Sequence, residues 1–166
     1  MTRVIKAAPL SAEAFAPYGD VIEASEKTKK ISINYGNTTR FHDLMKVDVA
    51  DEDGEPCVSI FRSTPLTLPI TIKLMEYHPF GSQAFIPLGH EPYLLVVANA
   101  GDFNANKIKA FIARSDQGVN YHKGTWHHFS LALNHTSDFL VLDRKGEGNN
   151  CVEYALPVDE QVIITF

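Results

Sequence analysis

Apolar and polar residues alternate over short stretches through most of the chain, with the period of two that is typical of half-buried β-strands. Turn residues, glycine above all, interrupt these stretches at short intervals, which favours an all-β sandwich or barrel. A helix is expected only near the start, where Ser11 can cap a short apolar turn that runs through Phe15. The pattern predicts strands over residues 20–23, 31–35, 41–49, 56–62, 71–78, 82–87, 93–98, 107–113, 126–133, 138–143 and 152–155.

The composition fits one folded domain over residues 1–166. Hydrophobic residues make up 45% and charged residues 21%, so neither disorder nor a fibrous repeat is indicated. The net charge of −5 and the scattered basic residues argue against a nucleic-acid partner. No apolar run approaches the roughly 18 residues that span a bilayer, and the start lacks a signal-like stretch, so no membrane partner and a cytoplasmic location are expected. Cys57 and Cys151 are expected to be reduced.

The segment 71–78 carries the most informative pattern. Its even positions place Glu76 and His78 on one face of a strand, together with the aliphatic Ile72 and Leu74. If that face lines the interior of a barrel, a metal ion, a charge partner or the counter-group of an anionic substrate must compensate the buried charge. Burial among aliphatic side chains would also raise the pKa of Glu76 towards neutrality and suit it to act as a base.

Two further groups are expected near this pair. Gln83 begins the next strand after a short reversal, which would bring it beside His78. About 40 residues later, a glycine turn leads into the segment 118–128, which ends in His127 and His128. Adjacent residues of a strand face opposite sides, so only one of these two histidines can point inward.

The order Glu76-x-His78-x4-Gln83 resembles a degenerate first cupin motif, in which His-x-His and a Glu supply ligands. Residues 122–127, His-x-Gly-x-x-His, resemble the second cupin motif, Pro-x-Gly-x-x-His, so His127 is expected to be the inward histidine. The resemblance implies an all-β fold, a cupin-type β-barrel of two packed antiparallel sheets with a short N-terminal helix. Glu76 stands at the first His position and the neutral Gln83 at the Glu position, which leaves a weaker ligand set than in ordinary metal cupins.

Six short sequence motifs, which occur in the same order over essentially the full length of the chain, resemble those of the ureidoglycolate lyase family. They lie at residues 15–22, 40–44, 76–79, 83–87, 118–122 and 126–128. This resemblance implies a homodimeric enzyme that eliminates urea from (S)-ureidoglycolate to leave glyoxylate in allantoin breakdown. It also suggests nickel as the divalent metal.

The expected chemistry rests on a small set of side chains. Carboxylate oxygens and imidazole nitrogens suit Ni, Mn, Fe or Zn. A base would remove the hydroxyl proton, and Glu76 or His127 could serve. The candidate metal ligands are Glu76, His78, Gln83 and His127, and the candidate catalytic residues are Glu76, His78, His127 and Tyr121.

The carboxylate of ureidoglycolate needs a cationic partner. A guanidinium offers the bidentate fork that planar anions prefer, so Arg62 is the first candidate and Arg40 the second. Gln83 and Lys123 complete the expected substrate-binding set, and Lys123 and Tyr121 would steady the ureido group.

Two other functions remain open at this point. A hydrolase that splits the ureido carbonyl would release ammonia and carbon dioxide instead of urea. A non-catalytic cupin could bind a small acid as a sensor, since a fold alone does not establish an activity.

Overall fold

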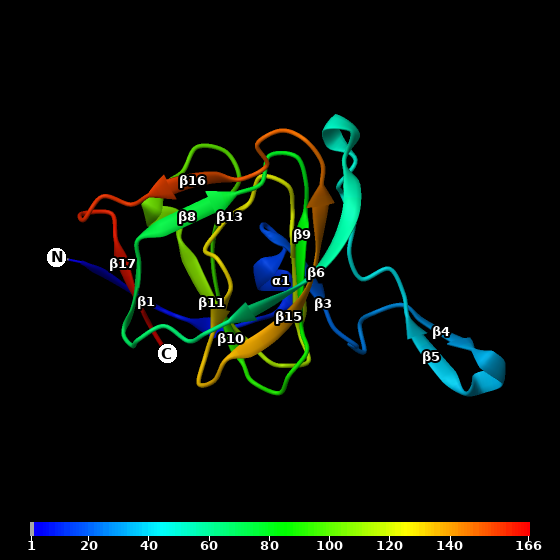
Figure 1. The fold of residues 1–166 in the computed structure, drawn as a ribbon. Helices are drawn as coiled ribbons and strands as arrows, with labels where there is room; N and C mark the ends of the chain where they lie inside the picture. Colours follow the sequence, from blue (N-terminus) through cyan, green and yellow to red (C-terminus); the bar gives the residue numbers. More distant parts are fainter. Residues whose placement is uncertain (1) are drawn as a thin grey trace.

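The computed structural model describes residues 2–166 and places two large, mainly antiparallel sheets face to face (Figure 1). The five-stranded sheet contains β3 (Gly19–Ile22), β12 (Gly118–Tyr121), β9 (Gln83–Pro87), β15 (Ser137–Lys145) and β6 (Glu55–Ser63), in that order. The seven-stranded sheet contains β16 (Val152–Ala155), β8 (Leu74–Tyr77), β13 (Trp126–His127), β10 (Tyr93–Ala98), β11 (Lys109–Ala113) and β2 (Ala8–Pro9), with β14 (Leu131–Ala132) paired to β10.

Two smaller sheets complete the fold. One contains β1 (Arg3–Lys6), β17 (Val162–Thr165) and β7 (Ile70–Ile72), and the other is a hairpin of β4 (Lys30–Ile33) and β5 (Thr38–Phe41). Figure 1 shows this hairpin standing away from the large sheets. Single 3-10 turns lie at Asn34–Gly36, Asp51–Asp53 and Ala105–Lys107.

The central strand β10 is buried on both faces, which explains its unbroken apolar sequence. Leu95 and Val97 enter a core between the two large sheets, where they meet residues such as Phe85. Leu94 and Val96 enter a second core against the three-stranded sheet. The molecule therefore has three layers of sheet and two apolar cores.

The all-β class and the short N-terminal helix are confirmed. Helix α1 (Ala12–Phe15) begins where the Ser11 hydroxyl accepts a hydrogen bond from the backbone N–H of Ala14, and it buries Phe15 completely. Within residues 2–166, the two large sheets pack together without joining into one continuous hydrogen-bonded barrel. None of the helices described is long and apolar enough to cross a membrane.

The strand expected over residues 71–78 is two strands. The chain breaks at Lys73, so β7 joins the three-stranded sheet and β8 the seven-stranded sheet. Ile72 and Met75 consequently enter the same core, and the strand face of Glu76 is not the aliphatic face that strict alternation predicts.

The strand expected over residues 41–49 is also wrong. Strand β5 ends at Phe41, and the segment that follows lies against the five-stranded sheet instead of pairing as a strand. The carbonyl oxygen of Lys46 accepts a hydrogen bond from Asn120 of β12, and that of Asp48 accepts one from the backbone N–H of Ser82. These hydrogen bonds satisfy two backbone carbonyl groups of the segment without a strand ladder.

Candidate active site

Glu76 and His127 lie directly opposite each other on the antiparallel strands β8 and β13. Cross-strand partners share one face of a sheet, and Val97, the β10 partner of His127, belongs to the core between the large sheets. The register therefore directs both side chains towards that core. His127 Nε2 lies 3.5 Å from Glu76 Oε1, and the His127 side chain is only 1% exposed.

His78 follows directly after β8 and joins the same cluster. One ligand atom from each of Glu76, His78 and His127 lies within 4.8 Å of the other two, and the two imidazole ring centres are 5.1 Å apart. The break at Lys73 does not alter this grouping, because the two-residue spacing from Glu76 to His78 falls after the break.

Backbone carbonyl oxygens orient both imidazoles. His78 Nδ1 lies 2.6 Å from the carbonyl oxygen of Asn150, and His127 Nδ1 lies 3.0 Å from that of Thr125. A carbonyl oxygen can only accept, so each Nδ1 carries the hydrogen. Each Nε2 is then directed at the cluster, as in metal-binding histidines whose second nitrogen donates to the protein.

Gln83 contributes a further acceptor. Its Nε2 donates to Asp143 Oδ2 at 3.1 Å, which turns its Oε1 towards His78 Nε2, also at 3.1 Å. Gln83 begins β9 in the five-stranded sheet, so the cluster spans both large sheets.

The cluster is rich in lone pairs and poor in hydrogens. Within residues 2–166, the buried His127 Nε2 has no hydrogen-bond partner, although it faces the Glu76 carboxylate. Glu76 Oε1 and Gln83 Oε1 face the two Nε2 atoms, so acceptors face acceptors. A cation, either an additional proton or a metal ion, satisfies such a set. The residues present therefore fit a divalent metal ion.

The pKa of Glu76 corrects the expectation from sequence. Burial opposes the charge of Glu76, but its polar contacts with His127, His78 and the Cys151 thiol outweigh burial and hold the pKa of Glu76 below its ordinary 4.5. The neighbours of this carboxylate are imidazoles rather than aliphatic groups, so Glu76 is ionised. Burial lowers the pKa of His127, which keeps that imidazole neutral.

Tyr121 lies at the end of β12 and packs on His127. The two rings are stacked, with 4.1 Å between their centres. Burial, with the Glu76 charge adding to it, raises the pKa of Tyr121, so its phenol stays protonated. His128 faces away from the cluster, and its Nδ1 donates to the carbonyl oxygen of Phe129.

Cys151 and Glu153 form the exposed side of the cluster, and sequence reasoning did not single them out. Cys151 Sγ lies 3.7 Å from Glu76 Oε2, and Glu153 pairs in register with Glu76. Glu76, Cys151 and Glu153 also form a group close enough to hold a metal ion. Strand β16 was predicted, but its pairing with β8 joins positions 75 to 81 residues apart and has no local signal.

Three predicted substrate-binding cations lie away from the cluster. Arg62 is exposed and makes two hydrogen bonds to the Asp138 carboxylate, at 2.8 and 2.9 Å. Lys123 donates to Asp51 Oδ2 at 2.6 Å. Arg40 lies on the exposed hairpin. Partner carboxylates hold the first two, so the structure does not bring these cations to Glu76 within one chain.

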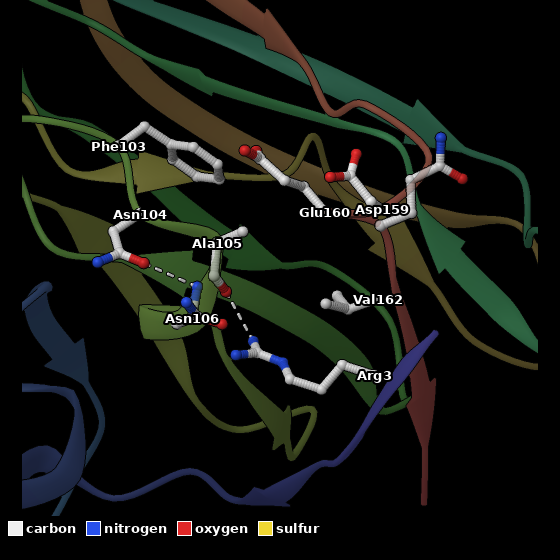
Figure 2. Close-up of a pocket in the computed structure, with 9 residues that line it drawn as sticks. Arg3, Phe103, Asn104, Ala105, Asn106, Asp159, Glu160 and Val162 are labelled. Carbon is white, nitrogen blue, oxygen red and sulfur yellow. Dashed lines mark hydrogen bonds between the residues drawn. The ribbon is translucent and has the colours of Figure 1, made fainter. Parts of the chain in front are cut away.

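A separate cavity of about 380 Å³ lies beside the three-stranded sheet (Figure 2). Arg3 Nη2 donates there to the carbonyl oxygen of Ala105, and Asp159 and Glu160 line the same cavity. This cavity shares no residue with the Glu76 cluster, which alone combines a carboxylate with two inward imidazole nitrogens among residues 2–166.

Comparison with known proteins agrees with the family resemblance of the six short sequence motifs. Residues 2–164 match the model of a protein family described as ureidoglycolate lyase. The ureidoglycolate lyase of Burkholderia mallei (strain NCTC 10229) is 56% identical over 149 residues, which cover 90% of this chain and 87% of that protein. The ureidoglycolate lyase of Pseudomonas fluorescens (strain Pf-5) is 47% identical over 163 residues, which cover 98% and 97%. The solved structure of the sugar 3,4-ketoisomerase QdtA from Thermoanaerobacterium thermosaccharolyticum has a TM-score of 0.42 and 14% identity, covering 80% of this chain and 85% of that chain.

Proposed function

Since this chain belongs to the ureidoglycolate lyase family, we propose that it eliminates urea from (S)-ureidoglycolate at the cluster of Glu76, His78 and His127. The observation that carries this assignment is the convergence of one carboxylate and two inward imidazole nitrogens on a single point between the two large sheets.

The reaction is an elimination that consumes no water. The hydroxyl group of ureidoglycolate loses its proton, the bond between that carbon and the ureido nitrogen breaks as the carbonyl forms, and the nitrogen leaves with a proton. The products are glyoxylate and urea. One proton therefore has to travel from oxygen to nitrogen, and a single carboxylate can both accept and return it.

Glu76 is the residue to which we assign this transfer. Its Oε1 faces His127 and its Oε2 faces the exposed side of the cluster at Cys151, where a substrate can approach. The low pKa of Glu76 makes it a weak base but, once protonated, a strong acid, which favours delivery of the proton to the departing nitrogen.

His78 and His127 hold the cluster in position. Their Nδ1–H groups donate to the backbone, so neither imidazole can rotate without losing a hydrogen bond. Tyr121 covers one face of His127 and excludes water there. We therefore assign Tyr121 a positioning role instead of a contact with the ureido group.

The residues that would hold a divalent metal are Glu76, His78 and His127, with Gln83 beside them. A bound metal ion would neutralise the oxygens of the substrate and lower the pKa of its hydroxyl group. Nickel is the ion we propose, on the family resemblance of the six short sequence motifs, and the ligand set also suits Mn, Fe and Zn.

We also propose a homodimer in the cytoplasm. The dimer follows from the resemblance of the sequence to the family. Cys57 and Cys151 are both unpaired, and free thiols suit a reducing compartment.

The test is a product assay on purified protein supplied with ureidoglycolate. Urea and glyoxylate should appear in equal amounts without ammonia, and activity should fall after chelation and return with added metal. Ammonia and carbon dioxide instead of urea would assign an amidohydrolase, and binding without turnover would assign a sensor.

A further inference from the structure

Residues 24–42 form an arm whose strands pair with no strand in the rest of the described chain, which is called the body below. Its strands β4 and β5 pair only with each other among residues 2–166, so each keeps a free edge. Figure 1 shows the hairpin extending away from both large sheets. A two-stranded hairpin is marginally stable alone in water, and free strand edges readily pair with another chain.

Most residues of the arm are exposed, and the rest are partly buried. None of residues 24–42 is buried, and the tip residue Tyr35 is fully exposed while Ile33 is 36% exposed. The arm therefore offers apolar side chains that its own body leaves uncovered.

The arm and the rest of the chain carry net charges of opposite sign. The arm contains four basic residues and one acidic residue, a net charge of +3. Because the whole chain has a net charge of −5, the remainder has −8. A basic arm and an acidic body attract each other between copies of the same chain.

The Glu76 cluster lacks the cation that an anionic substrate needs. The groups in polar contact with the Glu76 carboxylate are the His127 imidazole and the Cys151 thiol, and no Lys or Arg of residues 2–166 forms an ion pair with it. Glu153 and Asp143 add negative charge around the cluster. These negative charges would repel a substrate carboxylate. Arg40 on the arm takes part in none of the ion pairs among residues 2–166.

We propose that the arm of one copy crosses onto a second copy and brings its Arg40 to the exposed side of the second copy's Glu76 cluster. Each complete site then draws residues from two chains. A two-fold symmetric pair exchanges both arms at once and completes both sites. The proposal rests on the proposed function, because Arg40 has the role of binding the carboxylate of ureidoglycolate.

Two variants test this arrangement, one that alters the arm and one that alters the cluster, because a mixed dimer combines the intact arm of one chain with the intact cluster of the other. Arg40→Met removes the guanidinium from an exposed position and should raise KM about 10- to 100-fold, since a charged hydrogen bond is lost. Glu76→Gln should abolish turnover. When the two variants are unfolded together and refolded at equal amounts, activity should return to roughly a quarter of wild type, because half of the dimers are mixed and each carries one complete site.

Activity of the mixture no higher than the average of the two separate variants would overturn the proposal. Lys109→Met, which removes an exposed charge from the body, is the matched control and should behave as wild type. A chain in which a Gly-Gly turn replaces residues 30–41 should sediment as a monomer, and a dimer as tight as wild type would also overturn the proposal. Sedimentation does not depend on turnover. It therefore still tests whether the arm forms the dimer, even if the wild-type protein releases no urea and the proposed function is wrong.

Discussion

The phenol ring of Tyr121 lies almost parallel to the imidazole of His127, with 4.1 Å between ring centres and 7° between ring planes. The two residues come from different sheets, β12 of the five-stranded sheet and β13 of the seven-stranded sheet. Their stacking therefore couples the two sheets at the point where the candidate site is built.

This stacking predicts different effects for two substitutions at Tyr121. Tyr121→Phe keeps the ring and should retain most of the turnover. Tyr121→Leu removes the ring from the His127 face and should lower kcat more than it raises KM, with a stability loss of about 1–3 kcal/mol. Urea release and thermal denaturation measure the two effects. Equal loss of kcat in both variants would show that the hydroxyl group, rather than the stacked ring, matters.

Much of the fold was predictable because alternation is a local signal. The stretch at residues 93–98 and the short helix before Pro17 follow from neighbouring residues, and both are present. The break at Lys73 was not predictable, because it arises where the residues before and after Lys73 pair with strands of two different sheets. The short strands β1 and β17 pair in parallel from opposite ends of the chain, a relationship that no local pattern carries.

The site shows the same division. Glu76 and His78 share a face by simple spacing, and the motif spacing selected His127 over His128. The contact of Cys151 with Glu76 depends on the register between β16 and β8. Lys123 does not join the Glu76 cluster, because its ammonium group binds the carboxylate of Asp51. Long-range pairing and partner choice lie outside what residue spacing can predict.

Replacing Glu76 should separate folding from chemistry. Glu76→Gln keeps the size of the side chain but removes its charge and one acceptor, so turnover should fall at least about 100-fold while the fold is retained. Metal affinity measured by calorimetry should fall as well. Glu55→Gln, on the exposed strand β6, is the matched control. Wild-type activity in the Glu76 variant would remove this residue from the mechanism.

Cys151 should react slowly with alkylating agents although it is exposed. Burial of its thiol and the negative charges of Glu76 and Glu153 raise the pKa of Cys151 to about 11, and only the thiolate reacts. In a Cys57→Ser background, the iodoacetamide rate should rise about tenfold for each pH unit from 7 to 10. Glu76→Gln should accelerate the reaction at neutral pH. A plateau near pH 8.5 in the parent would contradict the predicted influence of Glu76.

Tyr93 should set an alkaline limit to stability. Its ring is 2% exposed and its hydroxyl group donates to the carbonyl oxygen of Gln117 at 2.6 Å. Burial raises the pKa of Tyr93 well above its ordinary 10.0. The unfolded chain therefore releases this proton near pH 10 while the folded protein keeps it, so the stabilising contribution is complete below pH 10 and declines as pH rises further.

The free energy of unfolding in urea, measured from about pH 8 to 11, tests this sign. Tyr93→Phe loses the hydrogen bond and should be less stable than wild type by about 1 kcal/mol at pH 8. Because the variant has no proton to lose at this position, its stability should decline less steeply above pH 10, and the two curves should converge. Tyr35→Phe, at the exposed tip of the arm, should follow the wild-type curve. Parallel curves for wild type and Tyr93→Phe would show that the buried phenol does not govern alkaline unfolding.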